Sequence, residues 1–184
     1  MTLKRNENTT EELETAALAL ICADALEAAG NPGQAAEEFR QIALAVKAAS
    51  DEEPGDPSED PIELRLDFIR MTDLRYAVRL IGLCVDVSPL LLHGVQTLPA
   101  AAMAEYGTAA ELLAAAARSA AYRVYRGTRT MENRAEARHY NSKALDGSRK
   151  AGKLLSAVCD TAYRKLTILY NNSCKLITQM IHYL

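Results

Sequence analysis

Eight alanines are concentrated in the stretch EYGTAAELLAAAARSAAYRVYRG, which runs from Glu105 to Gly127. Alanine has the highest helix propensity because its side chain loses no rotamer freedom in a helix. Thr108 and Glu111 have the spacing of a capping box, in which each side chain bonds an otherwise unpaired amide of the first turn. The stretch therefore predicts a central helix that opens at Thr108 and ends near Gly127.

The alanine run has two interpretations. Small side chains let helices approach closely, and this can happen either at the middle of a bundle or across a subunit interface. The sequence favours the packed bundle centre and leaves the interface as the alternative.

The rest of the chain is also helical in character. It has 184 residues, of which 49% are apolar, with eight Tyr, two Phe and no Trp. This length is enough for one domain with a sizeable core. We therefore predict a single all-α domain over residues 1–184, a bundle of six or seven helices with a long C-terminal helix.

Capping and helix-breaking residues divide the chain before the central helix. Thr9 with Glu12, Asn31 with Pro32, and Ser88 with Pro89 are expected to open helices, and Gly30 to end one. An acidic, proline-containing linker is expected at about residues 50–60. The expected helices cover residues 9–30, 31–49, 60–85, 88–96 and 97–107.

The last helix is expected to be unusually long. One apolar stripe follows Ser148, and neither Gly nor Pro occurs after Gly152. About 30 residues would form a helix of about 45 Å at 1.5 Å per residue. A helix of that length extends past a compact monomer, so we expect a homodimer; Asn171 and Asn172 mark where it could break instead.

Charge is distributed unevenly along the chain. Residues 1–107 contain 8 Lys and Arg against 19 Asp and Glu, a net of −11, whereas residues 108–184 contain 13 against 5, a net of +8. The two halves could neutralise each other by packing. Otherwise the basic half offers a surface for an anionic ligand, because clustered cations concentrate anions; a nucleic-acid partner is not expected.

The cellular location of the protein and the state of its cysteines are predicted from sequence patterns that are missing. The sequence shows no signal-peptide pattern and no uninterrupted run of about 18 apolar residues, so a cytoplasmic protein without a membrane partner is expected. The four cysteines have no CxxC or zinc spacing, which favours buried free thiols. They are Cys22, Cys84, Cys159 and Cys174.

No complete catalytic or metal motif is present, so the sequence does not decide whether the chain is an enzyme. Glu136-x-x-His139 has the spacing of half a di-iron site, but such a bundle needs a second copy and two further carboxylates. We therefore expect no metal. Walker, GxGxxG and GxSxG motifs are absent.

One short motif suggests a ribonuclease. Arg134-x4-His139-Tyr140 resembles the R-x4–6-H motif of the HEPN ribonucleases, helical domains that act as dimers. The resemblance implies that Arg134 contacts phosphate and that His139 is the acid or base, alongside Arg138. Arg134 and His139 are thus the candidate catalytic residues, although two exposed basic residues on a helix turn would give the same pattern.

A longer resemblance begins at Ser88-Pro89-Leu90. The pattern VSPLLL, then AEYG, then an alanine-rich helix ending in AAYRVYRG resembles the formiminotetrahydrofolate cyclodeaminase and methenyltetrahydrofolate cyclohydrolase family over about 40 residues. That family implies an all-helical dimeric bundle. No cofactor is required by any motif here, and the resemblance would allow a folate-like ligand.

Several residues that the family uses are replaced. Thr108 stands where the family has Asn after Gly, the functional Ser-Asp is missing, and Arg123 and Gly127 stand near the two asparagines of its NVRIN motif. The N-terminal PGGG loop has only Asn31-Pro32-Gly33 as an echo. The resemblance therefore implies a degenerate relative that binds a ligand without the family's catalysis.

Three functions remain open. The first is a degenerate folate-type bundle that binds an anionic small molecule near a subunit interface. The second is a non-catalytic helical interaction or scaffolding protein, and the third is the ribonuclease. Arginine forks suit carboxylate or phosphate and tyrosine rings stack on planar ligands, which makes the ligand-binding candidates Tyr106, Arg118, Tyr122, Arg123, Tyr125 and Arg126.

Overall fold

The computed structural model describes residues 3–30, 33–51 and 62–182, with side chains described for 14–30, 33–49 and 70–173. Five α-helices and one 3-10 turn make up these residues, and they contain no strand. The elements are α1 (Leu3–Ala28), α2 (Gln34–Asp51), α3 (Ile62–Thr97), η1 (Ala100–Ala102), α4 (Met103–Thr128) and α5 (Arg134–His182). The all-α prediction is confirmed, and the predicted six or seven helices are wrong.

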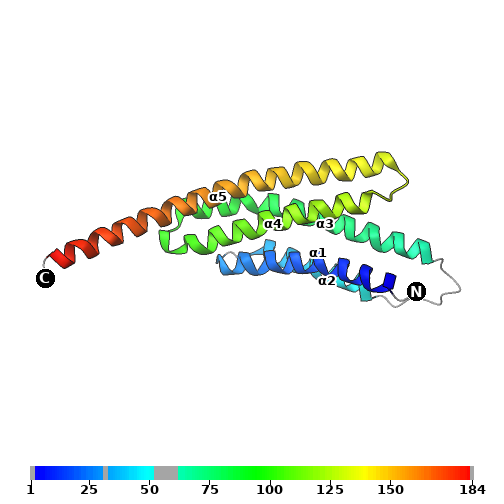
Figure 1. The fold of residues 1–184 in the computed structure, drawn as a ribbon, viewed down its shortest axis with the longest axis horizontal. Coiled ribbons are helices and arrows are strands. Elements are labelled where there is room, and N and C mark those ends of the chain that lie inside the picture. Colours follow the sequence, from blue (N-terminus) through cyan, green and yellow to red (C-terminus); the bar gives the residue numbers. More distant parts are fainter. Residues whose placement is uncertain (1–2, 31–32, 52–61, 183–184) are drawn as a thin grey trace.

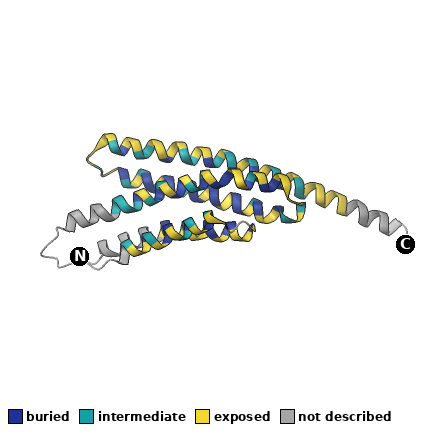
Figure 2. Ribbon diagram, turned by 180° about the vertical axis from the view of Figure 1, so that it is seen from behind, coloured by how far each residue is buried: buried dark blue, intermediate teal, exposed yellow. Residues whose placement is uncertain are grey.

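The helices form three layers. α5 packs on α3 and α4, and α1 with α2 packs on the opposite side of that central pair, as Figure 1 shows. In the described residues, α5 contacts neither α1 nor α2. The central pair therefore carries most of the core, and Figure 2 shows buried residues concentrated on it.

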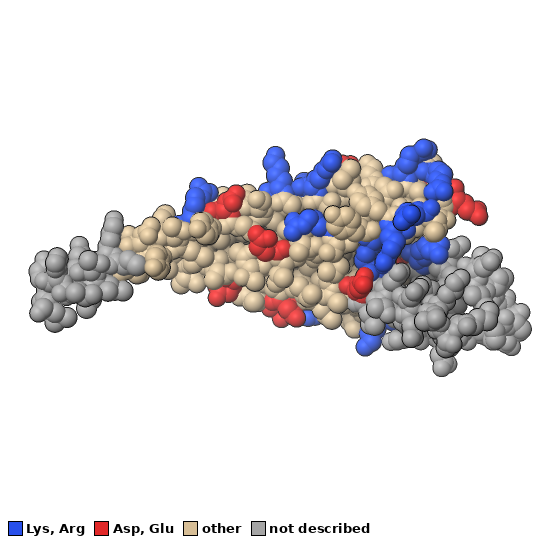
Figure 3. Space-filling view, viewed as in Figure 1, with Lys and Arg blue, Asp and Glu red and all other residues tan. Residues whose placement is uncertain are grey.

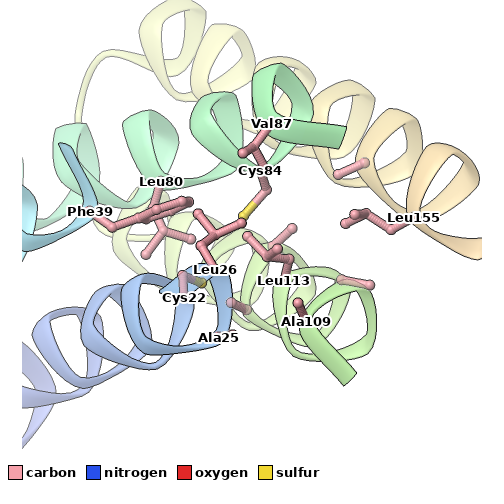
Figure 4. Packing of buried hydrophobic residues seen from close by; sticks show 14 of the residues in the cluster. Cys22, Ala25, Leu26, Phe39, Leu80, Cys84, Val87, Ala109, Leu113 and Leu155 are labelled. Atoms are coloured by element: carbon pink, nitrogen blue, oxygen red, sulfur yellow. The ribbon is translucent and has the colours of Figure 1, made fainter. Parts of the chain in front are cut away.

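The alanine run lies inside the bundle. Of its eight alanines, all except Ala115 are buried. Figure 4 shows the neighbouring Leu113 beside Leu26 of α1, with Cys84 of α3 pointing toward them, and Leu155 of α5 belongs to the same buried cluster. The interpretation of the run as a tightly packed bundle centre is thus the one that the structure supports.

α3 is continuous across the boundary predicted between Val85 and Ser88, and it ends at Thr97, next to the end predicted near Gln96. Ser88 does not cap a new helix, because its hydroxyl donates a 2.5 Å hydrogen bond to the carbonyl of Cys84 in the preceding turn. Pro89 lies inside α3, where it removes one backbone donor. α3 ends at Thr97, whose hydroxyl donates to the carbonyl of His93 at 2.9 Å. The core positions Cys84, Val87, Leu91 and Val95 continue across the proline and stay buried, which is the packing that keeps the helix in one piece.

Other predicted boundaries also shift. α4 begins at Met103, five residues before Thr108, so the Thr108–Glu111 capping box is wrong and both residues lie within the helix. α1 begins at Leu3 rather than at Thr9. Gly30 does end the first helical segment, with a φ of 69° that glycine adopts without strain. The Asn31-Pro32 start and residues 52–60 of the acidic linker lie outside the described residues.

α5 is longer than predicted. Its 49 residues begin at Arg134 and pass through Gly147 and Gly152 without a break, and also through Asn171 and Asn172. At Gly147 an added Cβ would lie 2.6 Å from Cγ2 of Ile81, so glycine permits close approach of α5 to α3. Lys165 donates to the carbonyls of Gln96 and Leu98, at 3.1 and 2.8 Å, where α3 ends. Beyond that point α5 extends past the bundle (Figure 1).

One segment of α3 has the length and composition of a membrane span. It covers Arg70–Thr97, and many of its apolar side chains are buried against α4 and α5. Core helices of soluble proteins have the same length and composition, so these two properties do not by themselves indicate a membrane span.

Candidate functional site

Three of the six predicted ligand-binding residues share one exposed face of α4. Arg118, Tyr122 and Arg126 follow one another at intervals of four residues, which places them in a row along a helix. All three are exposed, and Tyr122 keeps 72% of its surface accessible.

The other three residues point into the bundle or lie at its edge. Tyr106 is buried, with 5% of its surface exposed, and its ring packs on Gly94 of α3. It stands 20 residues from Arg126, which is about 30 Å along the helix axis. Tyr125 is half-buried against the core. The structure therefore does not bring the six residues together at one site.

Arg123 connects three helices through ion pairs. Its Nη1 lies 2.5 Å from Oε2 of Glu14 in α1, and its Nη2 lies 3.0 Å from Oδ2 of Asp73 in α3. Asp73 also accepts a 2.8 Å hydrogen bond from the buried hydroxyl of Thr15. The guanidinium side chain is only 6% exposed. Its geometry makes it a structural clamp between α1, α3 and α4.

The connection between α4 and α5 is held by side chains on both sides. Asn133 caps α5, because its Oδ1 accepts hydrogen bonds from the amides of Ala135 and Glu136, both at 3.2 Å. The buried hydroxyl of Thr128 donates to Oδ1 of Asn141 at 2.8 Å. This turn is thus a defined structure that fixes where the neighbouring side chains project.

Four arginines project around this turn, and we call them the basic end of the bundle. They are Arg126, Arg129, Arg134 and Arg138. All are exposed, and Nη1 of Arg134 donates to the carbonyl of Arg129 at 3.2 Å. Figure 3 shows Lys and Arg gathered here and along α5. Glu132 and Glu136 are the acidic residues of the same turn, so cations prevail.

Arg129 was missed by sequence reasoning. It lies in the turn, outside the helices, and no motif includes it. The sequence signal that could have identified it is the presence of arginines on both sides of a short non-helical segment, because a turn there brings such arginines together. Only the turn geometry, set by Asn133 and Thr128, shows that these residues share one end.

The ribonuclease candidates are exposed but point in different directions. Residues five apart on a helix are separated by about 140° around its axis, so Arg134 and His139 lie on different faces of α5. Arg138, four residues after Arg134, shares the face of Arg134 instead. His139 makes an edge contact with Tyr140, their ring centroids 6.2 Å apart.

Two cysteine thiols have raised pKa values, and the described residues contain no metal-binding cluster. No three His, Cys, Asp or Glu side chains there are placed to hold a metal ion. Burial and the neighbouring Glu111 raise the pKa of the Cys159 thiol to about 11, so it is protonated at neutral pH. A hydrogen-bonding contact with Cys22 and burial raise the pKa of Cys84 well above its ordinary value.

Replacing the cap residue should loosen the basic end. We expect Asn133→Ala to lower the free energy of unfolding by about 1 kcal/mol, because two α5 amides lose their side-chain acceptor. Asn133→Asp should retain most of the stability, since aspartate also caps well. Urea unfolding followed by circular dichroism measures both, and equal stability of Asn133→Ala and wild type would contradict the capping role.

Comparison of the sequence with protein-family models and with curated proteins finds no match. The folate-enzyme and HEPN resemblances thus rest on the motif residues alone.

Proposed function

We propose that this helical bundle binds an anionic small molecule at its basic end, through Arg126, Arg129, Arg134 and Arg138. The observation that carries the proposal is the gathering of these exposed guanidinium groups around one turn that side-chain hydrogen bonds hold in place. Arginine forks bind carboxylate and phosphate in a bidentate manner, and a fixed turn lowers the entropy cost of ordering them.

The ligand class is the one expected from the sequence, an anionic small molecule, but the proposed binding site lies at the turn between α4 and α5 rather than along α4. Arg126 belongs to both sets, whereas Tyr106 and Arg123 have structural contacts that account for them. Kinship with the folate enzymes enters the proposal only as one choice of anion, a folate whose carboxylates would face the arginines. Docking of an acidic partner protein would use the same chemistry and is the alternative.

The test compares two pairs of substitutions that change charge equally. Binding of folate, ATP and single-stranded RNA is measured by titration calorimetry and by thermal shift at low salt. We expect Arg129→Gln with Arg138→Gln to weaken binding of the preferred anion at least about tenfold, because hydrogen bonds to charged groups contribute roughly 1.5–3 kcal/mol each. Lys150→Gln with Lys153→Gln, on exposed positions farther along α5, should weaken it far less.

Each outcome has a clear meaning. An equal loss in both pairs would show non-specific attraction to overall charge, and no binding of any probe would reject the proposal. RNA cleavage that His139→Ala abolishes would instead establish the ribonuclease.

A further inference from the structure

The outward face of α4 carries a regular row of exposed residues. Their spacing is three or four, the pattern of residues that meet along the seam of a coiled coil. We call this row the α4 seam, and its members are Ala104, Thr108, Glu111, Ala115, Arg118, Tyr122 and Arg126. All are exposed, and Glu111 also lies beside the Cys159 thiol of α5.

Charge along the seam changes sign about its centre. Glu111 lies four residues before Ala115, and Arg118 lies three residues after it. Outside them, Thr108 and Tyr122 are each seven residues from Ala115. The row is therefore acidic on one side of Ala115 and basic on the other.

We propose that α4 pairs with α4 of a second copy of this chain, antiparallel, with the twofold axis at Ala115. Each Glu111 then lies beside Arg118 of the other copy, and each Thr108 beside Tyr122. Two opposite-charge contacts form, one on each side of the axis, as a symmetric dimer requires. A parallel pair would place Glu111 beside Glu111 and Arg118 beside Arg118, which like-charge repulsion disfavours.

The size of the residues at the axis suits close approach. Ala115 is the one alanine of the run that faces outward, and a small side chain at the axis lets two helices come to about 8–10 Å. The seam from Ala104 to Arg126 spans about 33 Å of helix. The other seven alanines are buried within the monomer, so the interface would use the opposite face of α4 from the one that the alanine run occupies.

Apolar side chains of α1 and α4 border the centre of the seam. The ion pair between Glu14 and Arg123 sets the register of α1 against α4. The two helices run antiparallel (Figure 1). Ile21, seven residues after Glu14 on α1, is therefore at the level of Ala116, seven residues before Arg123 on α4. Ile21 is 43% exposed and Leu112 of α4 is 37% exposed. A second copy would cover this apolar area, which gives the interface a centre besides its charged pairs.

The inference goes beyond the proposed anion site and can fail separately from it. An antiparallel pair places the two basic ends at opposite ends of the dimer. Arg126 belongs to both the seam and the basic end, whereas Arg129 and Arg138, which the anion test changes, lie outside the seam. Anion binding by a monomer would leave the proposed function intact, and a dimer without anion binding would leave this inference intact.

Charge reversal at Glu111 and Arg118 distinguishes contacts between two copies from contacts within one copy, because only contacts between copies can be restored by mixing two variants. Glu111→Arg and Arg118→Glu are each expected to raise the dimer dissociation constant at least about tenfold, because both contacts become repulsive. Mixing the two variants should restore association as a heterodimer, since one copy is then basic at both positions and the other copy is acidic at both. The double variant in one chain should also dimerise.

Sedimentation equilibrium at about 100 µM protein would detect a dimer with a dissociation constant of about 10 µM. Asp86→Arg and Lys150→Glu, exposed positions outside the seam, are the matched controls and should leave the dimer unchanged. Circular dichroism should show that all variants fold. A monomeric wild type, single variants that still dimerise, or a mixture that stays monomeric would overturn the proposal.

Discussion

Gly94→Ala is expected to destabilise the bundle by about 2 kcal/mol, although alanine is the better helix former. A Cβ at position 94 would lie 2.7 Å from both Cζ and the hydroxyl oxygen of Tyr106, and closer still to Cε1. Tyr106 is buried, so its ring cannot move aside without displacing the core where α3 meets α4. The overlap therefore outweighs the gain in helix propensity. The urea midpoint, at an unchanged m-value, measures the loss.

Gly82→Ala in the same helix is the matched control. No atom lies within 4 Å of a Cβ built at Gly82, so this substitution should stabilise the protein by about 0.5–1 kcal/mol. Gly94→Ala combined with Tyr106→Leu should recover part of the loss, because the smaller side chain leaves room for the methyl group. A Gly94→Ala protein as stable as Gly82→Ala would show that the ring does not occupy this position.

The all-α class could be read from the sequence because it follows from local preferences. Alanine density and apolar spacing act within each segment, and so does the left-handed glycine at position 30 that ends the first helical segment. Helix boundaries could not be read so well. Ser88 has the residue type of a helix cap, but its hydroxyl bonds back to the carbonyl of Cys84 and α3 continues past it, whereas α3 does end at Thr97, close to the predicted end near Gln96. That choice depends on whether the next turn packs into the core, which is a tertiary property.

The candidate site shows the same division. Arg118, Tyr122 and Arg126, three of the six candidates, share one exposed face because a helix places residues four apart on one side. Arg123, one position on from Tyr122, is turned by about 100° around the helix axis into the bundle and pairs with residues 50 and 109 positions away in sequence. No local pattern reveals such partners. The grouping of four arginines at the basic end could not be predicted from the sequence either, since it depends on the geometry of the turn that joins α4 to α5.

Replacing Arg123, the cation that pairs with Glu14 and Asp73, should also lower the stability of the bundle substantially. Arg123→Met is expected to lower the free energy of unfolding by about 2 kcal/mol, less than the 3–5 kcal/mol typical of a fully buried pair. The loss is smaller because the Asp73 side chain is 21% exposed, so water partly replaces the guanidinium that lies 3.0 Å from its carboxylate. Glu14 is 58% exposed and contributes little, because water screens it. Urea unfolding at neutral pH measures the loss.

Substitutions of the partners of Arg123 show which of its contacts accounts for the lost stability. Glu14→Gln should change stability by less than about 0.5 kcal/mol, as for an exposed ion pair. Arg123→Met with Asp73→Leu and Thr15→Val should recover most of the Arg123→Met loss, since an apolar cluster of similar volume leaves no stranded carboxylate. If Glu14→Gln costs as much as Arg123→Met, the clamp acts through α1 alone. If the triple variant is no more stable than Arg123→Met, the loss comes from packing of the arginine stem rather than from the carboxylate that it neutralises.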